Sequence, residues 1–121
     1  MLRDEELTYR ICGCVFEVYR QLGHGFLESV YQRALVHELS GKGVLVEEEK
    51  PVAISYKGHE IGGFWLDLIL ENRVTLELKA QQKLPLGAEA QLMNYLKATG
   101  LKTGLLVNFT FPKATVKRIV F

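Results

Sequence analysis

The sequence contains little of what would mark a disulfide scaffold or a zinc protein. Its 121 residues include only two cysteines, three prolines and one tryptophan. Cys12 and Cys14 lie two positions apart, and on a helix such side chains diverge by about 200°. They could hardly bond to each other or share a metal there, and no zinc-ligand spacing occurs elsewhere. We therefore expect two buried free thiols.

Long apolar runs and nucleotide-binding loops are also absent. No run approaches the roughly 20 apolar residues that a membrane span requires. The first residues, Met1–Glu6, lack the apolar stretch of a signal peptide, so the expectation is a cytoplasmic protein with no membrane partner. No loop of the GxxxxGK type occurs, which argues against an ATP-driven function and against a nucleotide cofactor.

The composition is that of one ordinary globular domain with an uneven distribution of charge. Hydrophobic residues make up 48% of the chain and charged residues 24%, which predicts a single domain over residues 1–121. Residues 1–78 carry a net charge of −5 and residues 79–121 a net charge of +6. A basic half beside an acidic centre suits a bound polyanion; an unevenly charged solvated surface is the alternative.

Apolar spacing and turn residues predict an alternation of helices and strands. Helical periodicity predicts three helices, over residues 4–22, 27–40 and 85–99. Turn residues then bound several strands, over 44–46 and 51–56 (one strand or two), 61–70, 74–80, 103–108 and 116–121. This order predicts one α/β domain with a mixed sheet whose faces are covered by helices. Trp65 is expected in the core.

The segment Thr75–Lys79, together with Asp67, forms the central candidate site. In a strand, Glu77 and Lys79 share one face because side chains at i and i+2 point the same way. Mg²⁺ prefers oxygen ligands, which Asp67, Glu77 and the carbonyl of Leu78 would supply. Lys79 would hold an attacking water or neutralise a phosphate oxygen, which suits phosphodiester hydrolysis. An ordinary salt-bridged pair on a strand is the alternative.

Three further residues carry weaker signals. Glu28 lies in the first turn of the second helix, where either the helix start stabilises it or the helix aims it at the same cation. Gln91 and Tyr95 lie four residues apart on the third helix and share a face. They would contact a nucleotide, the lysine and a metal-bound water, or neighbouring backbone groups.

Taken in order, these signals resemble a known family. Residues 25–31 read Gly-x-x-Glu-x-x-Tyr, and Asp67, the Glu77-Leu78-Lys79 segment and a Gln-x-x-x-Tyr segment follow. The chain thus resembles the GxxExxY family of the PD-(D/E)xK nuclease-like superfamily from about residue 11 to residue 121. Leu66 stands where the superfamily name has proline, and Ala88 stands where family members often carry histidine.

The resemblance implies a fold, a site and an activity. The fold is a restriction-endonuclease-like core with a mixed central sheet of about four strands flanked by helices. Glu28, Asp67 and Glu77 would bind the metal and Lys79 would be catalytic, while Gln91 and Tyr95 would complete the site. The implied function is a Mg²⁺-dependent nuclease, with Mn²⁺ as a substitute, acting on DNA or RNA.

Two other functions stay open at this stage. A catalytically weak or inactive nuclease-fold module would bind nucleic acid or a protein partner without cleaving, because a shared fold does not establish activity. A metal-dependent hydrolase of a small phosphoester would use the same residues. A domain this small would need a homodimer or a protein partner to hold a duplex.

Overall fold

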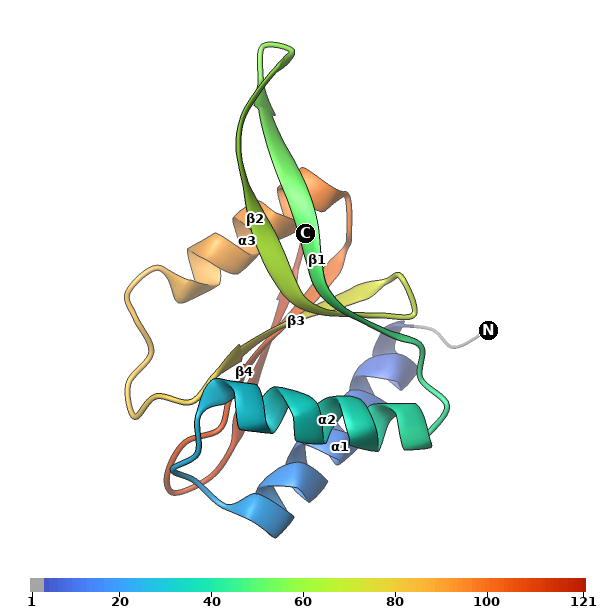
Figure 1. Ribbon diagram of the computed structural model, residues 1–121, viewed down its shortest axis with the longest axis vertical. Coiled ribbons are helices and arrows are strands. Elements are labelled where there is room, and N and C mark those ends of the chain that lie inside the picture. Colours follow the sequence, from blue (N-terminus) through green and yellow to red (C-terminus); the bar gives the residue numbers. More distant parts are fainter. Residues whose placement is uncertain (1–3) are drawn as a thin grey trace.

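The computed structural model describes residues 4–121, which form three helices and five strands (Figure 1). In chain order they are α1 (Asp4–Leu22), α2 (Glu28–Gly41), β1 (Val46–Tyr56), β2 (His59–Leu70), β3 (Val74–Lys79), α3 (Ala88–Thr99), β4 (Thr103–Asn108) and β5 (Thr115–Val120). The expected alternation is confirmed. The third helix begins three residues later than expected, because Pro85 precedes a turn that ends at Gly87, whose φ is +83°.

The strands form one mixed sheet in the order β1-β2-β3-β4-β5. Strands β3 and β4 are parallel, and the other neighbouring pairs are antiparallel. The sheet therefore has five strands where the resemblance implied about four. The fifth is the edge strand β5, which pairs along its whole length with β4.

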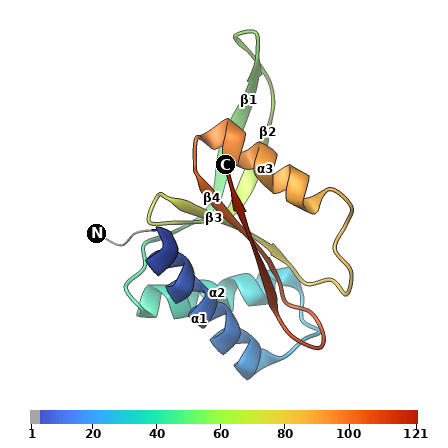
Figure 2. The same ribbon diagram turned by 180° about the vertical axis from the view of Figure 1, so that it is seen from behind.

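The helices cover both faces of the sheet (Figures 1 and 2). Buried residues of α1 and α2 share a core with Leu76, Leu78 and Leu105. On the opposite face Leu92 of α3 packs against Gly104 of β4, where an added Cβ would lie 2.9 Å from the leucine Cδ1. Because side chains alternate along a strand, Glu77 and Lys79 face the α3 side while Leu76 and Leu78 face α1 and α2.

Strands β1 and β2 extend well beyond the rest of the sheet. They pair from Val46↔Leu70 to Tyr56↔His59, whereas β2 pairs with β3 only over Leu68–Leu70. Residues 51–65 therefore form a two-stranded arm, seen at the top of Figure 1. The segments expected as one strand or two are a single strand, β1.

Two expectations about single residues have different outcomes. Trp65 is 61% exposed, so its expected place in the core is wrong. It lies on the arm, in the part of β2 that pairs with β1 but not with β3. Cys12 and Cys14 are free, and Cys14 is buried while Cys12 is half-buried. Among residues 4–121, no helix is long and apolar enough to cross a membrane.

Candidate active site

The candidate site lies where β2 separates from β3. Their ladder ends at the pair Leu68↔Leu76, so Leu78 has no backbone partner on β2. Its N–H instead donates to Oδ2 of Asp67, at 2.8 Å. A side chain thus replaces the missing strand contact, and it holds the Asp67 carboxylate against β3 beside Glu77.

Glu77 is a buried acid with an unsatisfied oxygen. The residue is 7% exposed, and its Oε1 is buried with no hydrogen-bond partner among the described residues. Burial, and then the charge of Asp67, raise the pKa of Glu77 to about 8. Burial also raises the pKa of Asp67, against the lowering effect of the Leu78 N–H. A buried carboxylate beside a half-buried one, each resisting ionisation, is a costly arrangement unless a cation is present.

Lys79 is half-buried at the end of β3, on the same face as Glu77. Its positive charge lowers the pKa of both Glu77 and Asp67, although less than burial raises it. It has no ion-pair partner within 4.0 Å in the described part of the chain. Its ammonium group is thus near the two carboxylates without being engaged by either.

The backbone at Lys79 is fixed by the end of β4. The N–H of Phe109 donates to the Lys79 carbonyl at 2.8 Å. The buried side chain of Asn108, which pairs with Lys79 in the parallel register, accepts from the N–H of Gln81 at 3.0 Å and donates to the Gln81 carbonyl at 2.8 Å. The sequence reasoning missed Asn108, whose only signal is a polar residue ending an apolar strand.

The Gly-x-x-Glu-x-x-Tyr spacing has a structural explanation. Tyr31 is fully buried, and its hydroxyl donates to the Gly23 carbonyl at 2.6 Å and accepts from the Phe26 N–H at 3.3 Å. Gly25 has a φ of +106°, which side chains rarely adopt. The glycine and the tyrosine together fix the loop that leads into α2, and hence the position of Glu28.

Glu28 is the first residue of α2 and is exposed. Its charge contributes to the raised pKa of Asp67, so the two carboxylates lie within electrostatic reach. The helix start stabilises a negative charge at this position.

Tyr95 is close to the carboxylates of Glu77 and Asp67, whereas Gln91 lies at the surface. The ring of Tyr95 stacks on Phe64 of the arm, with centroids 3.9 Å apart and planes 6° apart. Burial, and then the charges of Glu77 and Asp67, raise its pKa. Gln91 lies one turn earlier and is exposed. Tyr95 therefore links α3 to the arm at the edge of the site.

A fourth acid near this site was not predicted. Glu49 of β1 lies opposite Asp67 in the antiparallel register, between the pairs Glu48↔Leu68 and Lys50↔Leu66. Its charge contributes to the raised pKa of both Asp67 and Glu77. The sequence alone did not single out Glu49, because strand register is not visible from one segment.

The donor chemistry fits a hard divalent cation. Carboxylate oxygens are the ligands that such ions prefer, and Glu77 offers a buried oxygen with no other partner. Across residues 4–121, no three histidine, cysteine, aspartate or glutamate side chains are grouped closely enough to hold an ion. The arrangement is thus an incomplete set of ligands, in keeping with a cation that also binds water and substrate.

A comparison with protein families gives a match over almost the whole chain. The model of the PD-(D/E)XK nuclease superfamily matches residues 5–119. The chain belongs to the PD-(D/E)XK nuclease superfamily. Nucleases of this superfamily generally use divalent metals, which agrees with the carboxylates described above. The expectation at superfamily level is therefore confirmed.

Two solved structures are similar to this chain. The crystal structure of SSO0001 matches with a TM-score of 0.62 at 22% identity, over 76% of this chain and 48% of that one. The chain thus spans about half the length of that protein. An alkaline exonuclease from Laribacter hongkongensis matches with a TM-score of 0.45 at 12% identity, over 99% of this chain and 71% of the exonuclease. A search of curated proteins gave no match.

Proposed function

We propose that this PD-(D/E)XK protein is a metal-dependent nuclease of the GxxExxY group that hydrolyses phosphodiester bonds in DNA or RNA. The observation that carries the proposal is the buried, unpartnered Oε1 of Glu77, beside the carboxylate of Asp67. A purely structural domain gains nothing from this arrangement, because a buried carboxylate oxygen without a hydrogen-bond partner costs stability.

Each side chain has a role in this proposal. Asp67 and Glu77 hold the cation, with the carbonyl of Leu78 and the Glu28 carboxylate as further oxygen donors. A bound Mg²⁺, or Mn²⁺ in its place, supplies Lewis-acid chemistry and lowers the pKa of its water. Lys79 orients the attacking water or stabilises the charge that develops on the phosphate.

The remaining candidates act on the substrate. Tyr95, fixed by its stack on Phe64, and Gln91 lie on α3, beside the site, and would contact the nucleic acid. The exposed ring of Trp65, two residues before Asp67, offers a surface for base stacking. The basic second half of the chain supplies phosphate-binding charge, with a homodimer or a partner completing the surface for a duplex.

A cleavage assay with matched lysine variants tests the proposal. Single- and double-stranded DNA and RNA are incubated with the protein in Mg²⁺, Mn²⁺ or EDTA. We expect cleavage with metal and none with EDTA. Lys79→Ala should lower the rate by at least 100-fold, as expected for a group that stabilises the transition state. Lys42→Ala, which changes an exposed lysine at the C-terminal end of α2 and outside the basic half, should leave the rate within about twofold. Equal rates for both variants would exclude Lys79 from the chemistry.

The second candidate is a nuclease-fold module that binds nucleic acid or a protein without cleaving. The observation in its favour is that no three metal-ligating side chains come together among residues 4–121. It predicts nucleic-acid binding that persists in EDTA and in Glu77→Ala, with no cleavage under any metal condition. The same assay, run with a binding measurement, separates the two functions.

A further inference from the structure

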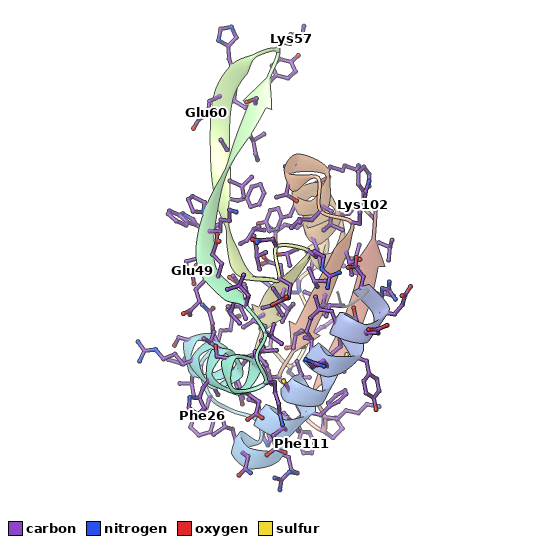
Figure 3. The ribbon with its side chains drawn as sticks, turned by 90° about the vertical axis from the view of Figure 1, so that its right-hand side faces the viewer. Phe26, Glu49, Lys57, Glu60, Lys102 and Phe111 are labelled. Carbon is purple, nitrogen blue, oxygen red and sulfur yellow. The ribbon has the colours of Figure 1, made fainter. Side chains whose placement is uncertain are left out.

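Glu49 adopts a backbone conformation that glutamate seldom takes. It lies in the middle of β1 with a φ of +50°, in the left-handed region. Its neighbours pair as Glu48↔Leu68 and Lys50↔Leu66, which leaves Glu49 opposite Asp67 without a regular bridge. Figure 3 shows Glu49 at the base of the arm, near α2. A conformation of this kind persists only where the surrounding structure requires it.

Helix α2 holds the Glu49 side chain in place. Nε2 of Gln32 donates to Oε1 of Glu49 at 3.1 Å, and lies 3.4 Å from Oε1 of Glu48. Gln32 is one turn after Glu28, so both point from the same side of α2. Glu49 is thus hydrogen-bonded to α2, which carries the candidate ligand Glu28. It also lies opposite the candidate ligand Asp67 on β2.

An independent observation points to a ligand at this place. The Oε1 atom of Glu77 is buried and has no hydrogen-bond partner among the described residues. Glu49 lies opposite Asp67 in the register of β1 and β2, which brings a third acidic residue to the same place. Placing a third negative charge near two carboxylates that already repel each other costs electrostatic free energy. A bound divalent cation would offset that cost.

We propose that Glu49 is a further acidic residue of the cation site, a positioning residue that acts through the water molecules the ion retains. Mg²⁺ keeps several of its waters when bound by only one or two carboxylates, and these waters need acceptors. Glu49 supplies such an acceptor from β1, and Gln32 fixes its direction. This inference rests on the proposed metal dependence and adds a residue to it.

Calorimetric titration of the metal-free protein with Mn²⁺ tests the inference. Glu49→Gln keeps the size of the side chain and removes its charge, and should weaken Mn²⁺ binding by about tenfold, as for other outer-shell partners. Glu48→Gln is the matched control, since Glu48 is adjacent and also lies near Gln32, yet it pairs with Leu68 and lies opposite no residue of the candidate site. It should change the dissociation constant by less than about twofold.

A glycine variant separates this role from a structural one. Glu49→Gly suits the positive φ, so its melting temperature should equal or exceed that of the wild type. Its Mn²⁺ affinity should still fall by about tenfold. A variant that is no less stable but binds metal less well identifies a residue held in a strained conformation for the cation.

The possible results separate a failure of the proposed metal dependence from a failure of the proposed role of Glu49. If the wild type binds no Mn²⁺, the proposed metal dependence fails and the role of Glu49 fails with it. If the wild type binds Mn²⁺ and Glu49→Gln binds equally well, only the role of Glu49 is overturned. A loss that is equal in Glu48→Gln and Glu49→Gln also overturns it, because the effect would then be one of general charge.

Discussion

At the scale of single residues, the site is defined by polar groups whose partners are missing or far apart in the sequence. The Leu78 N–H has lost its strand partner and uses Asp67, and Glu77 Oε1 has none in the described chain. The hydroxyl of Tyr31 shows the opposite case, because it satisfies two backbone groups of the loop before Glu28. The polar groups that have hydrogen-bond partners fix the backbone around the site. The Oε1 atom of Glu77, which has none among the described residues, marks where we expect the metal to bind.

The buried acid Glu77 predicts how stability depends on pH in the metal-free protein. Its pKa is about 8 in the folded state and ordinary, near 4.5, in the unfolded chain. The folded state therefore binds the extra proton, so stability is full below about pH 4.5 and falls as the pH rises toward 8. At about 1.4 kcal/mol for each pKa unit, the loss amounts to a few kcal/mol.

Urea denaturation in EDTA at pH 5 and pH 8.5 measures this effect. The free energy of unfolding of the wild type should drop between the two pH values, whereas Glu77→Gln should drop much less because it has no proton to lose. Glu89→Gln, on an exposed acid of α3, should follow the wild type. Parallel curves for the wild type and Glu77→Gln would show that Glu77 titrates normally.

Local spacing predicted some site residues and could not predict others. The i and i+2 relation of Glu77 and Lys79 depends only on strand geometry, so it is visible in the sequence. The positions of Glu49 and Asn108 depend on which strands pair and in which register, and no local pattern contains that information. The expectation that Trp65 lies in the core was wrong, because the alternation of apolar and polar residues predicts a strand but does not show where that strand extends beyond the sheet.

At the scale of elements, the end of β4 determines where Lys79 lies. The Asn108 side chain makes two hydrogen bonds to Gln81, and both are to backbone groups. It therefore acts as a short extension of the β3–β4 ladder beyond the last backbone pair. This contact fixes the chain just after the catalytic candidate.

Asn108→Ala should destabilise the protein by about 1–2 kcal/mol, the usual cost of removing a buried partner of two hydrogen bonds. It should also lower metal-dependent cleavage, because the chain that follows Lys79 is no longer fixed. Thermal melting and the cleavage assay measure the two effects. Asn94→Ala, on the exposed surface of α3, is the control and should stay within about 0.5 kcal/mol. An Asn108→Ala protein as stable and as active as the control would contradict this role.

The elements themselves were largely predictable, while their limits and partners were not. Apolar periodicity gave the helices, and turn residues such as Lys57-Gly58 gave the hairpin. Sheet order, the extra edge strand and the length of the arm depend on long-range pairing. The parallel pairing of β3 with β4 follows from the crossover through α3, which the order of elements already indicated.

At the scale of the whole molecule, the fold brings distant segments to one place. Charged side chains come to this place from four elements: α2, β1, β2 and the end of β3. The acidic and basic halves of the sequence are thereby combined in one domain. The chain belongs to the PD-(D/E)XK nuclease superfamily, and we propose that a divalent metal binds where these charges meet.

The most direct test is a crystal structure of the protein soaked in Mn²⁺, with the ion located by its anomalous scattering. If these residues bind the metal as proposed, we expect a peak between the carboxylates of Asp67 and Glu77, within about 2.5 Å of an oxygen of each. The peak should be absent from crystals of Glu77→Gln. A well-occupied peak elsewhere, or none beside these two residues in the wild type, would contradict metal binding by Asp67 and Glu77.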